Sequence, residues 1–269
     1  MRAPQFADPI RLRSVFISDV HLGFRGCRAD ALCDFLRSVR ADHLILVGDI
    51  FDLWSLKKSF FWPQSHSEVV RTILSRTRDG TKVIYVPGNH DELFRSLDGS
   101  VFGNLEVHRD YIHTTAAGRR LLVMHGDEFD SVVKCHAALV RIGTLIYDFL
   151  LWVNPFVNAV RRVFGLPGYS LAAALKAATP RAVQYMRNFE EAAAAAAQRR
   201  GVDGIVCGHI HQAALREMHG VLYCNDGDWV ESCTSLVEDM NGSLSVLHWQ
   251  DGDRRSVAAP AMGRPARAA

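Results

Sequence analysis

The sequence predicts an α/β fold built around a parallel sheet. In its N-terminal half, short apolar segments alternate with segments of helical spacing, an order typical of parallel strands joined by crossover helices. Short polar motifs follow several apolar segments directly, as in folds whose ligands bind at the carboxyl ends of strands. A long helical segment, 131–200, then interrupts the strand pattern and is expected to be inserted into the α/β domain.

The parallel core is expected from five elements in the order strand, helix, strand, helix, strand. Large apolar residues recur on one face of 29–40 at the spacing of an amphipathic helix. The dipeptide Asp79-Gly80 ends the second helix. The expected elements are strand Leu12–Ser18, helix Ala29–Arg40, strand His43–Val47, a helix containing Val69–Ser75, and strand Lys82–Val86.

Later strand-like segments with short turns are expected to flank this core in antiparallel orientation. The dipeptide Asn241-Gly242 is a strong hairpin signal between the last two. The segments are Leu105–His108, Leu121–Met124, Gly204–Cys207, Val221–Cys224, Ser235–Glu238 and Leu244–Trp249.

Residues 1–251 are expected to form one domain that carries 131–200 as a helical lid, and 252–269, rich in Arg, Ala and Pro, a disordered tail. The insert holds nine basic and three acidic side chains, so the basic excess of a chain with net charge +2 is concentrated there. Arg141 and Asp148 interrupt its apolar run, so it is not expected to span a membrane. It suits an anionic membrane surface or acyl chains of a substrate. The alternative is that it packs on the main domain or on a second subunit.

Composition places the chain among soluble globular proteins, with 48% hydrophobic and 22% charged residues. Six cysteines without a CxxC pair are expected to be reduced thiols in a cytoplasmic protein, and no secretory signal is evident. No basic strip with interleaved aromatics accompanies the polar motifs, so no nucleic-acid partner is expected.

Five polar motifs follow the apolar runs VFIS, LILV, VIYVP, LLVM and GIVC. Alone, each could be a turn or a core histidine, but five at strand ends should converge in space. Their carboxylate, imidazole and amide groups suit Mn²⁺, Fe²⁺ or Zn²⁺ and are too many for one ion, so a two-metal site is predicted. The motifs are Asp19-Val20-His21, Gly48-Asp49-Ile50-Phe51-Asp52, Gly88-Asn89-His90-Asp91, His125-Gly126-Asp127 and Gly208-His209-Ile210-His211.

In this order the motifs resemble the signature D-x-H, G-D-x-x-D, G-N-H-D, H, G-H-x-H of calcineurin-like metallophosphoesterases, over about residues 12–250. The resemblance implies a four-layered α/β/β/α sandwich and two divalent metals, with Mn²⁺ favoured. It implies that a hydroxide between the metals attacks phosphorus. The implied ligands are Asp19, His21, Asp49 and His211 for one metal, and Asp49, Asn89, His125 and His209 for the other.

The same resemblance implies that His90 contacts the substrate phosphate and assists the leaving group, while Asn89 helps to offset phosphate charge. Asp52 and Asp91 are candidates for orienting the imidazole ligands. Each could equally be a helix N-cap or a turn residue.

Within the family, the stretches ISDVHLG, LVGDIFDLW, HGDEFD and GDWVES are similar to bacterial UDP-2,3-diacylglucosamine diphosphatases of lipid A synthesis. That similarity implies cleavage to UMP and 2,3-diacylglucosamine 1-phosphate at the inner membrane, with acyl-binding candidates in 131–200. His90 stands where those enzymes typically have arginine, which leaves open a paralogue acting on another nucleotide or phospholipid-type substrate. A non-catalytic scaffold is the second alternative, although every ligand-type residue is present.

Overall fold

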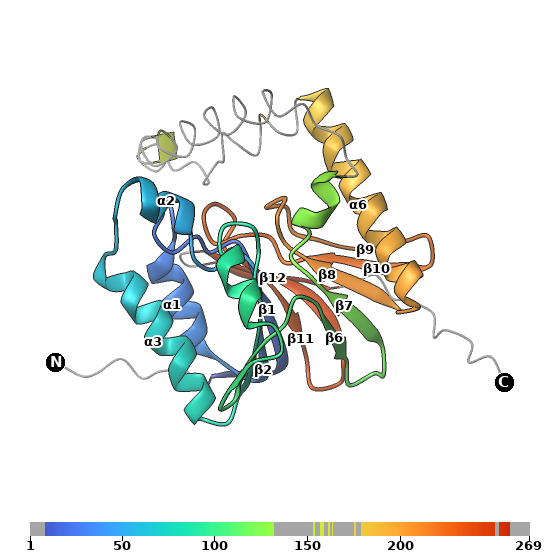
Figure 1. Ribbon diagram of the computed structural model, residues 1–269, viewed down its shortest axis with the longest axis horizontal. Helices are drawn as coiled ribbons and strands as arrows, with labels where there is room; N and C mark the ends of the chain where they lie inside the picture. Colours follow the sequence, from blue (N-terminus) through green and yellow to red (C-terminus); the bar gives the residue numbers. More distant parts are fainter. Residues whose placement is uncertain are drawn as a thin grey trace. The chain divides into compact units, whose positions relative to one another are not determined.

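The computed structural model describes residues 9–131, 179–250 and 253–258, together with positions 153, 157, 158, 161, 163 and 175 (Figure 1). It divides into two compact units, one of Met1–Asp127 with Ala194–Ala269, the other of Glu128–Ala193. The second unit overlaps the segment predicted as an insert. Most of that segment lies outside the described residues, so its function as a lid stays a prediction.

The first unit contains an eight-stranded sheet in the order β13-β12-β11-β1-β2-β3-β5-β4. Parallel pairing joins β1, β2, β3 and β5, and the strands on either side of them pair antiparallel. The predicted antiparallel orientation is confirmed for β11 and β12 and is wrong for β5, which extends the parallel pairing beside β3. The strands are β1 (Ile10–Ile17), β2 (Val39–Val47), β3 (Lys82–Val86), β4 (Val101–Phe102), β5 (Leu105–Val107), β11 (Thr234–Glu238), β12 (Leu244–Gln250) and β13 (Asp253–Ala258).

A second sheet of five strands has the order β6-β7-β8-β10-β9. Strands β7, β8 and β10 are parallel, and the edge strands β6 and β9 pair antiparallel. The antiparallel orientation expected for β7, β8 and β10 beside the first sheet is therefore wrong, because these strands pair with one another in a sheet of their own. The strands are β6 (Tyr111–Thr114), β7 (Arg120–Val123), β8 (Gly204–Cys207), β9 (Ala214–Met218) and β10 (Val221–Asn225).

The described helices are α1 (Ala29–Ser38), α2 (Leu53–Lys58), α3 (Gln64–Arg78), the 3₁₀ helices η1 (Glu92–Leu97) and η2 (Asp127–Ser131), and α6 (Pro180–Arg200). Among them, none combines the length and the apolar character needed to cross a membrane. In the second unit, the rings of Phe129 and Phe189 meet edge to face with centroids 5.4 Å apart. The hydroxyl of Tyr185 donates to Asp130 at 2.5 Å there.

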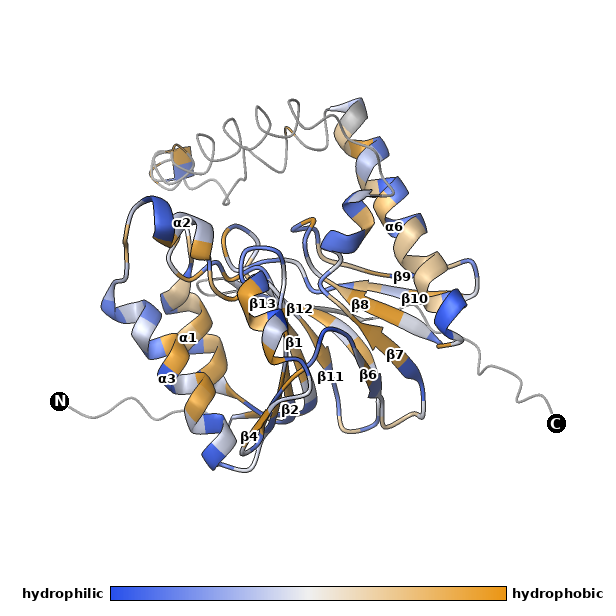
Figure 2. Ribbon diagram, viewed as in Figure 1, coloured by the Kyte–Doolittle hydropathy of each residue, from blue (hydrophilic) through white to orange (hydrophobic). Residues whose placement is uncertain are grey.

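The two faces of the eight-stranded sheet bury different sets of side chains, because successive residues of a strand point to opposite faces. Val15 and Ile17 of β1 join the apolar residues of α1 and α3 in one core. Phe16, between them, joins Val206 and Leu222 of the second sheet in another. Figure 2 shows these strands as largely hydrophobic. The two sheets therefore pack face to face under a helical layer.

The last turns of α6 attach to the second sheet. Arg200 pairs with Asp110 beside β6 at 2.6 Å, and Gln198 donates to the carbonyl of His219 at the β9–β10 turn. Ala194 and Ala197 are fully buried. The layers helix, sheet, sheet and helix are those of the predicted α/β/β/α sandwich.

Some helix and strand boundaries differ from the predicted ones, because pairing between strands outweighs the helical preference of the local sequence. The predicted helix 29–40 ends at Ser38, because Val39 and Arg40 already pair with Ile10 and Arg11 of β1. The predicted disordered tail is wrong for Asp253–Ala258, which forms β13 against β12. The rest of that tail lies outside the described residues.

Candidate metal centre

All the predicted ligands follow strands of the two packed sheets at their carboxyl ends. Asp19 and His21 follow β1, and Asp49 follows β2. Asn89 and His90 follow β3, whereas His125 follows β7 and His209 and His211 follow β8. Because both sheets direct their parallel strands to the same edge, motifs up to about 190 residues apart come within contact distance.

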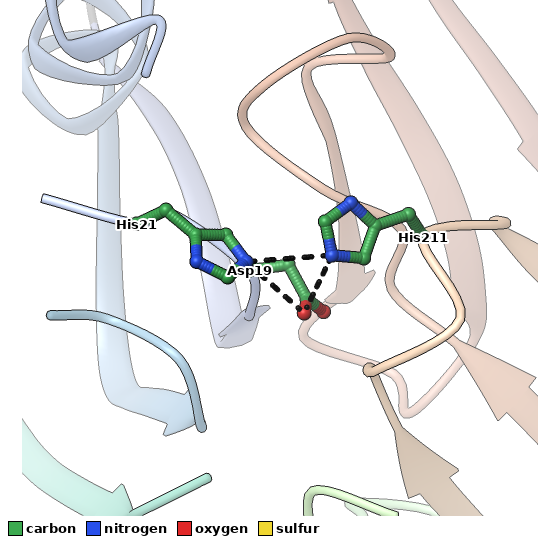
Figure 3. Close-up of side chains that lie close together, drawn as sticks. All are labelled: Asp19, His21 and His211. Atoms are coloured by element: carbon green, nitrogen blue, oxygen red, sulfur yellow. Dashed lines mark hydrogen bonds and ion pairs between the residues drawn. The ribbon is translucent and has the colours of Figure 1, made fainter. Parts of the chain in front are cut away.

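One cluster consists of Asp19, His21 and His211 (Figure 3). Nε2 of His211 lies 3.1 Å from Oδ1 of Asp19, and Nε2 of His21 lies 3.8 Å from the same oxygen. The two imidazole nitrogens are 3.4 Å apart. Three donor atoms therefore face one point, as around a bound cation.

A second cluster consists of Asp49, His125 and His209. Nε2 of His125 is 3.3 Å from Oδ2 of Asp49. Its Nδ1 lies 2.8 Å from the carbonyl of Val47, which can only accept, so Nδ1 carries a proton and Nε2 is the nitrogen left to bind a metal. This is the tautomer that a metal-binding histidine requires.

Asp49 connects the two clusters. Its Oδ2 lies 3.9 Å from Nε2 of His21 and 4.0 Å from Nε2 of His90, so these three residues form a third group of possible ligands. Its Oδ1 accepts a hydrogen bond from the backbone of His90 at 2.8 Å. One oxygen is thereby held by the loop after β3, and the other is central to both clusters.

Several candidate ligand atoms are buried and have no hydrogen-bond partner, as expected of atoms that bind a metal ion. Among the described residues, the buried polar atoms without a hydrogen-bond partner include Oδ1 of Asp19, Oδ1 of Asn89 and Nε2 of His125. Burying such atoms without a partner costs about 1–3 kcal/mol each. All three are predicted ligand atoms, and a divalent ion would satisfy them.

The electrostatics of the site also favours a cation. Burial lowers the pKa of His21, but the carboxylates of Asp19, Asp52 and Asp49 raise it to about 10. Burial likewise opposes the charged form of His125, yet Asp49 raises its pKa well above the ordinary value. Positive charge is therefore stabilised among these side chains by surrounding carboxylates.

The backbone is strained at the predicted ligands. In the described part of the chain, seven non-glycine residues have positive φ, and five of them are Asp19, His21, Asp49, His209 and His211, with φ between 50° and 68°. Such conformations cost on the order of 1–3 kcal/mol each and persist where the surrounding structure imposes them. The strain turns each side chain back toward the common edge of the sheets.

Two glycines are required by close approach. A Cβ at Gly88 would lie 2.3 Å from Oδ1 of Asp49. A Cβ at Gly208 would lie 2.4 Å from Oδ2 of Asp19. Only a hydrogen fits in either place, so these motif glycines let the carboxylates reach their positions.

Asp52 combines the two functions considered for it. Its Oδ1 accepts from the backbone of Ser55 at 2.7 Å, which caps α2. The same oxygen lies 3.0 Å from Nδ1 of His90, and Oδ2 lies 3.6 Å from Nδ1 of His21. Burial opposes ionisation, but these imidazoles hold the pKa of Asp52 below its ordinary value.

Asp91 accepts hydrogen bonds from backbone amides of the loops beside the metal centre. Its carboxylate accepts from the amides of Ile50 at 2.8 Å and Gly88 at 2.6 Å, and from the hydroxyl of Tyr85 at 2.6 Å. It also accepts from the amides of Asp49 and Phe51. Asp91 thus joins the loops after β2 and β3, and its contacts agree with the turn-residue alternative.

We expect Asp91→Ala to lower the free energy of unfolding by about 3 kcal/mol or more, because several buried amides lose a charged acceptor together. Urea denaturation of the purified variant would measure this. Glu92→Gln, at the exposed neighbouring position, is the control and should stay within about 0.5 kcal/mol of wild type. Equal stability of all three proteins would contradict the structural role of Asp91.

Two residues that support Asp19 were not among the sequence candidates. The hydroxyl of Ser18 lies 2.5 Å from Oδ2 of Asp19 and 2.7 Å from Oδ1 of Asp226. Asp226 is fully buried, and burial raises its pKa well above the ordinary value. The available signal was that Asn225 and Asp226 also follow an apolar strand, as the five motifs do.

Trp54 is a further residue at the site that sequence reasoning did not single out. Its ring lies against His90, with centroids 4.1 Å apart and planes inclined by 32°. The ring of His21 meets His90 edge to face at 4.6 Å. His90 is therefore held by a carboxylate, an indole and an imidazole. The signal for Trp54 was its place in the stretch LVGDIFDLW.

Sequence comparisons with known proteins identify the family of this chain. The calcineurin-like phosphoesterase family model matches residues 12–213. UDP-2,3-diacylglucosamine hydrolases of Neisseria meningitidis serogroup B and Xanthomonas campestris pv. campestris are each 26% identical over 86% of this chain, covering 96% and 97% of those proteins. A crystal structure of a Vps29 mutant from Entamoeba histolytica has a TM-score of 0.48 and 13% identity, covering 92% of this chain and 99% of that one. The chain belongs to the calcineurin-like phosphoesterase family and is a metal-dependent hydrolase.

Proposed function

We propose that the protein is a two-metal hydrolase that cleaves the pyrophosphate of UDP-2,3-diacylglucosamine to UMP and 2,3-diacylglucosamine 1-phosphate. The observation that carries the proposal is the pair of His/Asp clusters that Asp49 connects. Support for the substrate comes from the UDP-2,3-diacylglucosamine hydrolases that resemble this chain over most of their length.

Asp19, His21, Asp49 and His211 would hold one ion, and Asp49, Asn89, His125 and His209 the other. Two divalent ions, when bound, supply Lewis-acid stabilisation of phosphate charge and activation of a water. The donor set suits Mn²⁺, which we propose as the native metal, with Fe²⁺ and Zn²⁺ as alternatives. The amide of Asn89 can also face a phosphate oxygen.

His90 is the proposed catalytic residue. Its Nδ1 is held 3.0 Å from the carboxylate of Asp52, so its Nε2 points toward the cluster, 4.0 Å from Oδ2 of Asp49. From that position Nε2 can donate a hydrogen bond to a phosphate oxygen or pass a proton to the leaving oxygen. Stacking against Trp54 keeps the ring in this orientation.

A second candidate function is hydrolysis of another nucleotide or phospholipid-type substrate by the same centre. The observation that favours it is His90 itself, in place of the arginine typical of the diphosphatases. Because a shorter imidazole held by Asp52 reaches a phosphate differently from a guanidinium, the substrate could differ. A non-catalytic scaffold is disfavoured by the complete set of donor residues.

The acylated and non-acylated substrates separate these functions. With added Mn²⁺, we expect UMP release from UDP-2,3-diacylglucosamine to exceed that from UDP-glucosamine by roughly 100-fold or more in kcat/KM, the effect of burying a few methylenes. The apolar residues within 131–200 are the candidate acyl-binding site. Equal rates on both substrates would contradict acyl recognition, and activity only on bis(p-nitrophenyl) phosphate would favour the second candidate.

The proposed place of action follows from the substrate. A diacylated sugar nucleotide is anchored in a bilayer by its chains, whereas UMP is a cytoplasmic product. We therefore propose that the protein works in the cytoplasm, bound peripherally at the inner membrane. Nucleic acid is not a proposed partner.

A further inference from the structure

Helix α2 buries none of its own residues completely, as is also true of the 3₁₀ helix η1 among the described helices of the first unit. Trp54, Lys57 and Lys58 are its exposed residues, and they share one face because they are spaced i, i+3 and i+4. The side chain of Phe60, just beyond the helix, is 79% exposed, and Trp54 is 50% exposed. Two large aromatics and two lysines are therefore exposed within the segment 54–60.

The charged residues of α2 and the segment after it are all basic. The segment 53–67 contains both lysines and no acidic residue. The guanidinium of the exposed Arg25 lies over the ring of Phe61, 4.4 Å from its centroid, and adds a third cation. We call Arg25, Trp54, Lys57, Lys58 and Phe60 the α2 surface.

Exposure of aromatic side chains of this size to water is unfavourable, so exposed aromatics that lie together mark a surface that a partner covers. An indole or phenyl ring beside lysines matches the headgroup level of a bilayer, where the ring enters the acyl boundary and the cations meet lipid phosphates. Each basic residue near an anionic leaflet strengthens attachment, and acidic residues would weaken it. The three cations of the α2 surface are complementary in charge to such a leaflet.

The α2 surface also adjoins the metal centre. The Trp54 ring lies 4.1 Å from that of His90, which in turn lies 4.0 Å from Oδ2 of Asp49. Attachment through α2 would therefore hold the phosphate-cleaving residues close to the headgroups. Attachment of α2 to a bilayer would bring the metal centre closer to a substrate anchored there by acyl chains. It would not bring the centre closer to a substrate dissolved in water.

We propose that the α2 surface binds the anionic phospholipid bilayer. The proposal extends the proposed function, since it explains how the centre reaches a lipid-anchored substrate. Its test does not depend on hydrolysis, so either can fail alone.

The test is co-sedimentation of the full-length protein with vesicles of phosphatidylcholine, with and without phosphatidylglycerol. Wild type should bind the anionic vesicles more tightly, and added salt should weaken binding. Lys57→Gln/Lys58→Gln should weaken it on the order of 30-fold. Phe60→Ser should weaken it on the order of 10-fold. Matched controls are Arg78→Gln/Arg109→Gln and Phe102→Ser, which remove exposed groups elsewhere and should bind as wild type.

Hydrolysis of the water-soluble bis(p-nitrophenyl) phosphate should be unchanged in these variants, which excludes misfolding. Equal sedimentation with both vesicle types would overturn the proposal. So would wild-type binding by the α2 variants, which would assign attachment to another part of the chain. A shift of RNA or DNA mobility that the same substitutions abolish would identify a nucleic-acid surface instead. Vesicle binding without any hydrolysis would leave the inference standing and reject the proposed function.

Discussion

Replacing Asp49 by asparagine is expected to abolish hydrolysis and to deplete metal from both clusters. Oδ2 of Asp49 lies 3.3 Å from Nε2 of His125 in one cluster and 3.9 Å from Nε2 of His21 in the other, so this carboxylate connects the two. An amide would bring a neutral oxygen or an NH₂ group to this place. The rate should fall at least about 1,000-fold, beyond the 10–100-fold typical of losing an outer partner of a metal ligand.

The measurement combines metal analysis of the purified variant with its rate on bis(p-nitrophenyl) phosphate. Asp42→Asn, on the exposed part of β2, is the matched control and should keep wild-type metal and rate. Circular dichroism should show the same fold in all three proteins. An Asp49→Asn protein with full metal and full activity would refute the bridging position. A metal-loaded wild type that cleaves no phosphoester would favour the scaffold alternative.

The second large effect is expected from His90→Ala. Turnover should fall by roughly 100- to 10,000-fold, the range for loss of a general acid or base. Both metals should remain, because Asp19, His21 and His211 form one cluster without His90, and Asp49, His125 and His209 form the other. The decisive comparison is kcat against metal content of the same preparation.

His90 also belongs to a third group of possible ligands, with His21 and Asp49. Loss of an ion in His90→Ala would therefore show that His90 is a ligand and would contradict its proposed catalytic function. His219→Ala removes an exposed imidazole and should leave both rate and metal unchanged.

Much of the metal centre was predictable because its residues lie in short polar motifs that directly follow apolar runs. Strand β3 and strand β8 match their predicted bounds, since each is a short apolar run buried on both faces. The motifs come directly after such runs, and parallel strands bring their carboxyl ends to one edge. Convergence of Asp19 and Asp49 follows from this rule, whereas His211 follows a strand of the second sheet and reaches them through the packing of the two sheets.

Contacts between distant segments were not predictable in this way. The sequence left Asp52 and Asp91 equivalent, as imidazole partners or turn residues. The structure separates them, because the loop after β2 brings Asp52 to His90 whereas Asp91 lies beneath the backbone of Ile50. Strand β13 likewise depends on an exposed edge of β12 that no local pattern reveals.

The sequence by itself therefore determined the family, the α/β core and the set of candidate donor residues, because each is encoded in runs of a few neighbouring residues. Only the tertiary structure decided that Ser18 joins Asp19 to Asp226, that Trp54 stacks on His90, and that α2 presents a basic aromatic surface. The physical reason is that orientation and exposure depend on packing between segments far apart in the chain, and side-chain periodicity carries no information about which segments meet.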